Sequence, residues 1–117
     1  MAANREAFLA GGKRRYRDVA LPVAGVTVRI QSLTELEKAQ FEAEFYDTNG
    51  KKIRGRTLDS RARLIMLSLV DDAGEKLLAP GDETSVMQMD SADTGALWEA
   101  IWDHIEPKVK VEDLAKN

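Results

Sequence analysis

The 117-residue sequence contains no cysteine and only one histidine, His104. Without cysteine the chain has no disulfide framework and no thiolate chemistry, which suits a cytosolic protein. A zinc-binding helix needs two histidines one turn apart, whereas the residue four positions before His104 is Ala100. We therefore expect His104 to be a structural or surface residue, and we expect the protein to use no metal ion or other cofactor.

Long apolar runs and phosphate-binding glycine loops are also missing. The longest apolar run, residues 64–70, is interrupted by Ser68 and is far too short to cross a bilayer. The N-terminus lacks the apolar core of a signal peptide, because Asn4, Arg5 and Glu6 interrupt it. No G-x-G-x-x-G is present, and no nucleophile, base and orienting group can be named together. The sequence therefore predicts a cytoplasmic protein that is neither an enzyme nor bound to a membrane.

An acidic turn, Asp71-Asp72-Ala73-Gly74, follows the apolar run and invites comparison with a calcium-binding loop. Counted from Asp71, the third position is Ala73, and the sixth position, which requires glycine, is Lys76. The turn therefore does not fit a calcium site. We interpret it as a chain reversal in which Gly74 adopts a left-handed conformation.

The composition, 44% apolar and 32% charged, is typical of one globular domain. We predict an α+β fold, mostly helical, with an N-terminal β-hairpin at about residues 16–31 packed on three to four helices. Val26, Val28 and Ile30 alternate as in a half-buried strand, and Pro22 predicts that the first strand lies at an edge. Residues 1–15 are expected to form a flexible N-terminal segment, residues 16–106 the domain, and residues 107–117 a C-terminal tail.

The expected helices follow from capping and breaking signals. A helix opens at a capping box, either Ser32 with Glu35 or Thr34 with Glu37, and ends before Asp47-Thr48-Asn49-Gly50. After a basic loop at 51–56, a buried helix runs from about Leu58 to Val70, although periodicity also allows a buried strand over 64–70. Asp82 is expected to cap a short helix, and Ser91 or Asp93 to cap a last helix that ends at Pro107.

Charge is unevenly placed along this chain of net charge −3. Residues 13–17 and 51–63 are basic, whereas seven acids and no Lys or Arg lie between Asp82 and Glu106. Such blocks are typical of solvated helix faces, but they also favour head-to-tail contact between copies or contact with a charged partner. Nucleic-acid binding is the weaker alternative, because Tyr16 is the only aromatic residue among the basic ones and no recognition motif is present.

Two tryptophans, Trp98 and Trp102, lie four residues apart on the last predicted helix. Tryptophan is enriched at binding hot spots, but beside an apolar stripe it is equally an ordinary core residue, so both interpretations stay open. The candidate partner-binding residues combine this pair with three arginines of the second basic block: Trp98, Trp102, Arg54, Arg56 and Arg61.

Three segments together resemble the tail assembly chaperones of long-tailed, non-contractile bacteriophages. The first is Val26-Thr27-Val28-Arg29-Ile30-Gln31-Ser32-Leu33-Thr34-Glu35-Leu36-Glu37, a strand that runs into an acidic, capped helix. The second is Arg61-Ala62-Arg63-Leu64-Ile65-Met66-Leu67-Ser68-Leu69-Val70-Asp71-Asp72-Ala73-Gly74-Glu75-Lys76-Leu77-Leu78, an apolar helix that enters an Asp-Asp-x-Gly turn. The third is the small polar helix after Asp82 with the helix that follows it, so the resemblance covers roughly residues 16–106.

The resemblance implies a non-enzymatic assembly factor that acts in the host cytoplasm and is absent from the finished virion. Such proteins self-associate, coat and solubilise the tape measure protein, and help to recruit tail tube subunits. Another phage morphogenesis protein, such as a head–tail joining component, is the alternative. Many members also have a longer form made by a −1 ribosomal slip, and the ending Ala115-Lys116-Asn117 is compatible with the slippery codons GCA AAA AAC.

Overall fold

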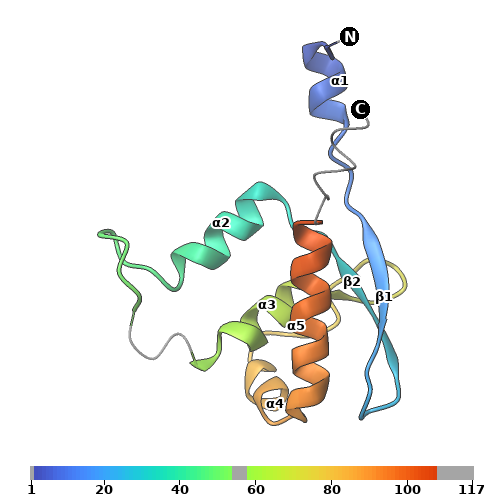
Figure 1. The fold of residues 1–117 in the computed structure, drawn as a ribbon, viewed down its shortest axis with the longest axis vertical. Helices are drawn as coiled ribbons and strands as arrows, with labels where there is room; N and C mark the ends of the chain where they lie inside the picture. The colour runs from blue at the N-terminus through green and yellow to red at the C-terminus, as the bar shows by residue number, and fades with distance from the viewer. Residues whose placement is uncertain (1, 54–57, 108–117) are drawn as a thin grey trace, which may run out of the picture.

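The computed structural model describes residues 2–53 and 58–107 and confirms the predicted α+β class. Arg54, Arg56 and the predicted tail after Pro107 lie outside the described residues. The elements in chain order are α1 (Arg5–Ala10), β1 (Tyr16–Ala20), β2 (Thr27–Gln31), α2 (Glu35–Ala43), α3 (Ser60–Ser68), β3 (Leu69–Val70), α4 (Glu83–Met87) and α5 (Ser91–Ile105) (Figure 1).

The predicted hairpin is confirmed by β1 and β2, which pair antiparallel with Tyr16 opposite Gln31 and Ala20 opposite Thr27. The strand order is β1-β2-β3, so β1 lies at an edge as predicted. Gly25 has φ of 71° in the turn, a conformation that glycine adopts without a steric penalty. Ile30 is fully buried, and the hairpin packs against α5 with this face.

The predicted helix from about Leu58 to Val70 is confirmed over Ser60–Ser68 and is wrong at its C-terminal end. Helix α3 begins at Ser60, and Leu58 is 79% exposed. At the other end Leu69 and Val70 form β3 and pair with Ile30 and Arg29 of β2. Apart from Ser68, the residues of this run are apolar, so periodicity could not show that the last two complete a sheet.

Helix α5 is the centre of the fold, with α3 and the sheet packed against it (Figure 1). The spacing of Leu97, Ile101, His104 and Ile105 predicts one buried stripe on this helix, and the first three are buried whereas Ile105 is half-buried. Leu64 and Ile65 of α3 are also fully buried against this core. The hydrophobic core therefore lies between this helix, α3 and the sheet.

The capping predictions had mixed outcomes. Thr34 and Glu37 form the predicted capping box, whereas Ser32 binds the backbone N–H of Arg15. Asp82 precedes α4 but accepts a hydrogen bond from Ala79 N, so it closes the preceding turn and does not cap the helix.

Neither Ser91 nor Asp93 caps α5, because Asp90 occupies the N-cap position and accepts from Ala92 N. Asp93 is 2% exposed and accepts hydrogen bonds from Val23 N at 2.8 Å and Ala24 N at 3.0 Å. Its carboxylate therefore joins the hairpin turn to the start of α5.

Helices α1 and α2 extend away from the central body (Figure 1). No residue of α1 is buried, and Phe8 and Leu9 on it are 77% and 60% exposed. Helix α2 buries Phe41, and Phe45 just after it is buried too, with their rings edge to face at 4.9 Å. The helical spacing of Leu33 and Leu36 predicts that both face the core, but Leu36 is 66% exposed, and Phe41 is the residue that α2 buries.

Candidate protein-binding surfaces

The structure brings three of the five predicted partner-binding residues together. Trp98 and Trp102 meet edge to face on α5, with ring centroids 5.7 Å apart. The guanidinium carbon of Arg61, on α3, lies 5.3 Å from the centroid of the Trp98 ring, within the range of a cation–π interaction. Both tryptophans are half-buried and touch the core. Each ring therefore serves the core on one side and forms part of a surface on the other.

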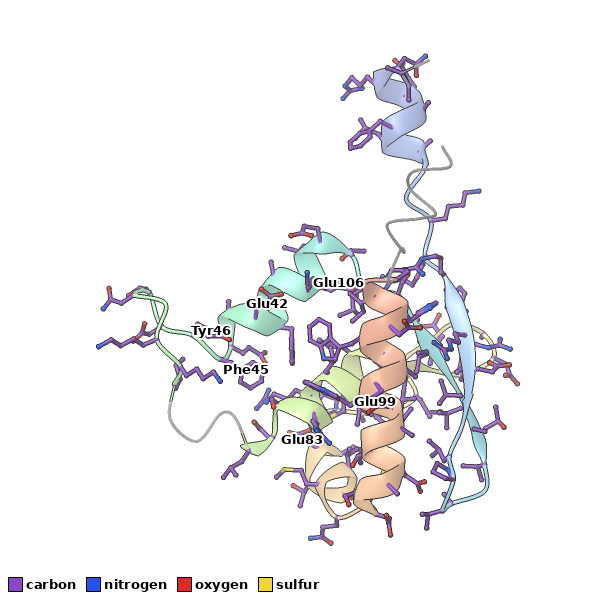
Figure 2. All side chains as sticks on the ribbon, in the orientation of Figure 1. Glu42, Phe45, Tyr46, Glu83, Glu99 and Glu106 are labelled. Atoms are coloured by element: carbon purple, nitrogen blue, oxygen red, sulfur yellow. The ribbon has the colours of Figure 1, made fainter. Side chains whose placement is uncertain are left out.

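This tryptophan surface, defined by Trp98 and Trp102, borders a shallow hollow of about 500 Å³. The other residues that line it are all acidic: Glu99, Asp103 and Glu106. Asp103 forms an exposed ion pair with Arg17 at 3.1 Å, and Glu106 pairs with Lys38 of α2. Figure 2 shows Glu99 and Glu106 on this face of α5. A ligand that approaches the tryptophans therefore meets a rim of carboxylates.

A second surface, an apolar groove of about 390 Å³, lies between α2, α3 and the segment that leads to α4. Its apolar lining is supplied by Phe41, Met66, Leu67, Leu78 and Pro80. Charged side chains at its edges are Glu37, Glu44, Arg63, Lys76 and Glu83. Sequence reasoning missed this groove, because it assigned residues 64–70 wholly to the core and residues 79–82 to a turn.

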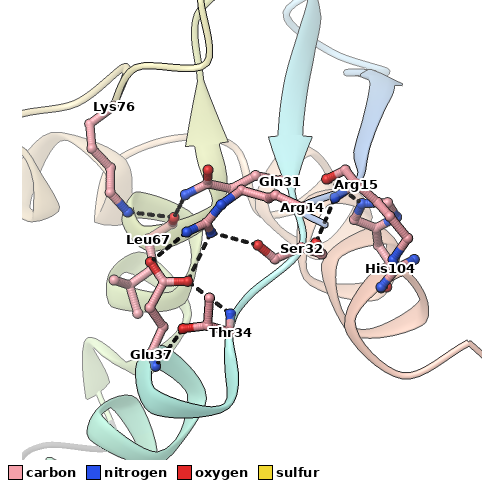
Figure 3. Close-up of polar contacts among 9 residues, drawn as sticks. All are labelled: Arg14, Arg15, Gln31, Ser32, Thr34, Glu37, Leu67, Lys76 and His104. Carbon is pink, nitrogen blue, oxygen red and sulfur yellow. Dashed lines mark hydrogen bonds and ion pairs between the residues drawn. The ribbon is translucent and has the colours of Figure 1, made fainter. Parts of the chain in front are cut away.

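A polar junction borders the groove, and Figure 3 shows its contacts. Arg14 donates to Ser32 O and to Glu37 Oε1, both at 2.8 Å, and so joins the N-terminal segment to the first turn of α2. Lys76 Nζ donates to Leu67 O at 2.6 Å on the opposite side. These contacts connect α2, α3 and the segment after β3 through side chains that flank the groove.

Two groups of the junction have shifted pKa values. Partial burial acts to raise the pKa of Glu37, but hydrogen bonds from Arg14 and Thr34 and the charge of Arg14 outweigh it, so the pKa is lowered. Partial burial lowers the pKa of Lys76; the charge of Glu37 opposes this effect, and the charge of Arg14 adds to it. Glu37 is therefore a charged acceptor at neutral pH, held between the capping box and Arg14.

The first basic block serves the fold. Besides Arg14, Arg15 donates to His104 O at 2.6 Å, and Arg17 pairs with Asp103. His104 Nε2 lies 3.2 Å from Arg15 O, and the residue is 8% exposed, which agrees with the structural role expected of it. The arginines of residues 14–17 are therefore engaged within the fold and do not form a free basic stripe for a nucleic-acid backbone.

Among the residues that the structure describes, no cluster of three or more His, Cys, Asp or Glu side chains is placed to hold a metal ion. Within the same residues, no helix has the length and apolar character needed to cross a membrane. The residues that line the two hollows offer apolar, aromatic and electrostatic contact with other molecules.

Comparison with known proteins gives a match in structure alone. No family model matches the sequence, and no curated protein matches it. A solved structure described as "Structure of bacteriophage HK97 tail assembly chaperone" superposes with a TM-score of 0.59, over 89% of this chain and 96% of that chain, at 18% identity. The chain has the fold of a bacteriophage tail assembly chaperone. Because the identity is low, the match establishes the fold, and residue roles must be argued from this chain's own contacts.

Proposed function

We propose that this chain is a tail assembly chaperone of a long-tailed, non-contractile phage. In this role residues 16–106 form one domain that self-associates, coats and solubilises the tape measure protein and helps to recruit tail tube subunits. It works without catalysis in the host cytoplasm and is left out of the finished virion. The observation that carries the proposal is the shared fold, which spans almost the whole length of the HK97 tail assembly chaperone structure.

The apolar groove supports a role in covering apolar helices. An amphipathic helix binds a groove through side chains spaced three and four residues apart, and a lining of aromatic, methionine and leucine side chains suits such contacts. This lining is provided by Phe41, Met66, Leu67 and Leu78. The charged residues at its edges keep the protein soluble while the groove is empty. We assign the tape measure protein to this groove and the tryptophan surface to a second protein contact.

Co-expression with the tape measure protein of the same phage tests the proposal. We expect the wild-type chain to keep that protein in the soluble fraction. Leu78→Lys places a charge in the groove and should abolish the effect, because an amphipathic helix would have to bury an unpaired ammonium group. Leu77→Lys is the matched control, because Leu77 is 47% exposed and borders a different hollow on the sheet side.

The folded state of both variants is checked by thermal unfolding before solubility is compared. If the wild-type chain neither binds nor solubilises the tape measure protein, the proposed function is wrong. If purified virions contain the chain in fixed stoichiometry, it is a structural component such as a head–tail joining protein. Equal loss of solubility in both leucine variants would show that the groove is not the binding site.

A further inference from the structure

A short hairpin after α2 presents two exposed lysines, Lys51 and Lys52. Asp47 N donates to Lys51 O at 2.8 Å, Ile53 N donates to Phe45 O at 3.1 Å, and Tyr46 bridges to Lys52. The side chain of Asp47 also accepts from Asn49 N and Lys51 N, which fixes the turn. Lys51 and Lys52 are exposed, and neither forms an ion pair with another described residue.

The opposite charge gathers on the face that carries the tryptophans. Figure 2 shows Glu99 on α5 and Glu106 directly after it, Glu42 on α2, and Glu83 at the start of α4. Glu99 has no ion-pair partner among the described residues. Asp103 and Glu106 have partners, but their side chains are 58% and 60% exposed, and such surface pairs are weak enough to exchange.

We propose that the tryptophan surface of one copy receives the Lys51–Lys52 turn of a second copy. The inference rests on the proposed function, whose self-association it specifies. The turn lies beyond the far end of α2, away from α5, so the pairing is between molecules (Figure 1). Lysine ammonium groups suit both parts of the site, since they can pair with the carboxylates of Glu99 and Asp103 and lie against the ring of Trp102, while Arg61 already lies over Trp98.

This contact is head to tail, because the turn and the tryptophan surface are different patches of one molecule. Each copy then keeps a free turn at one end and a free surface at the other, so the assembly grows as an open chain unless its geometry closes a ring. None of the contact residues lines the apolar groove, so every copy in the chain still offers its groove to a client helix.

A charge-swap experiment tests the contact. The turn variant is Lys51→Glu/Lys52→Glu and the surface variant is Glu99→Lys/Asp103→Lys; association is measured by sedimentation velocity at low salt. Reversing rim charges places like charges opposite each other, so each variant alone should associate about tenfold more weakly or worse. The chain with all four substitutions, and an equal mixture of the two variants, should recover association, because opposite charges face each other again.

Matched controls and a local probe accompany the swap. Lys13→Glu and Glu75→Lys alter exposed charges outside the contact and should leave association within about twofold of wild type. The chain has two tryptophans, both on this surface, so intrinsic fluorescence reports on this place alone. We expect the emission to shift to the blue as wild-type chains associate, and the shift to disappear in each charge-reversed variant.

The proposal is overturned if wild type stays monomeric, if the reversals leave association unchanged, or if association is lost but not restored by the swap. Client solubility separates this outcome from a failure of the proposed function. If the tape measure protein stays soluble while the swap fails, the contact is wrong and the function stands. If the surface variant loses the client while self-association persists, the tryptophan surface binds the client and not the lysine turn.

Discussion

The buried carboxylate of Asp93 should contribute strongly to stability, and its replacement by alanine is a sharp test of the fold. The side chain is 2% exposed and accepts from the backbone N–H groups of Val23 and Ala24. It is the polar connection between the tip of the hairpin and the first turn of α5. Asp93→Ala removes both hydrogen bonds without overfilling the site.

The expected cost follows from these contacts. A hydrogen bond to a charged acceptor contributes about 1.5–3 kcal/mol, so two of them contribute roughly 3–6 kcal/mol. Val23 and Ala24 are exposed, so water can reach their N–H groups once the carboxylate is gone and recover part of this loss. Alanine is a better helix former than aspartate, but it also loses the favourable charge at the helix N-terminus, and these terms nearly cancel. We expect a net loss of about 2–3 kcal/mol.

For a domain of this size such a loss lowers the Tm by roughly 10–20 °C, which calorimetry or circular dichroism measures directly. Hydrogen exchange gives the local reading, because the amides of Val23 and Ala24 should exchange faster in Asp93→Ala. The control Asp90→Ala removes the N-cap of the same helix, should cost about 1 kcal/mol and should leave those two amides protected. A Tm near that of wild type, or protection of both amides in Asp93→Ala, would refute this account.

Two further predictions concern the polar junction and the turn after β3. Because the pKa of Glu37 is lowered in the folded state, its stabilising contribution is present above about pH 4.5 and is lost as pH falls through the folded-state pKa. The difference in Tm between wild type and Glu37→Gln should therefore shrink in acid. A constant difference across that pH range would contradict this prediction. Gly74→Ala should cost about 1–2 kcal/mol in urea unfolding, because φ is 81° and the new methyl group would lie 3.2 Å from Tyr16 Oη. Gly12→Ala, with open space around the residue, should change the free energy of unfolding by less than about 0.5 kcal/mol, and equal effects at both glycines would be evidence against strain at Gly74.

Local signals in the sequence were sufficient for much of the fold. The capping box at Thr34 and Glu37, the reversal at Gly74 and the hairpin turn at Gly25 each depend on residues within a few positions. The spacing of Trp98 and Trp102 likewise fixed their common side of a helix. The same signals failed at Leu69 and Val70, because only the free edge of β2 determines that these residues leave the helix and form a third strand.

The candidate surfaces required information that no local pattern contains. Arg61 was grouped with Trp98 and Trp102 by residue type, but the stacking of Arg61 on Trp98 depends on how α3 crosses α5. The apolar groove depends on the packing of α2 against α3 and on the return of the chain through Leu78. Asp93 was predicted to cap a helix because aspartate favours that position, whereas its actual role depends on a turn seventy residues earlier in the chain.

The basic residues of this chain show that a charge pattern in a sequence can be assigned a function only after the structure shows which charges have partners within the fold. In the sequence, residues 13–17 and 51–52 carry the same kind of charge, and either could attract an acidic partner. The fold uses the first, since Arg14 holds Glu37 and Arg17 holds Asp103, while Lys51 and Lys52 stand on a fixed turn with no ion pair inside the described part of the chain. Arg14 and Arg17 already have partners within the fold, so they have less to gain from a second molecule than the lysines of a preorganised turn, which cost little entropy to bind. The contact between copies should therefore depend on Lys51 and Lys52, and their reversal should disturb association far more than reversal of Lys13, which lies outside the proposed contact.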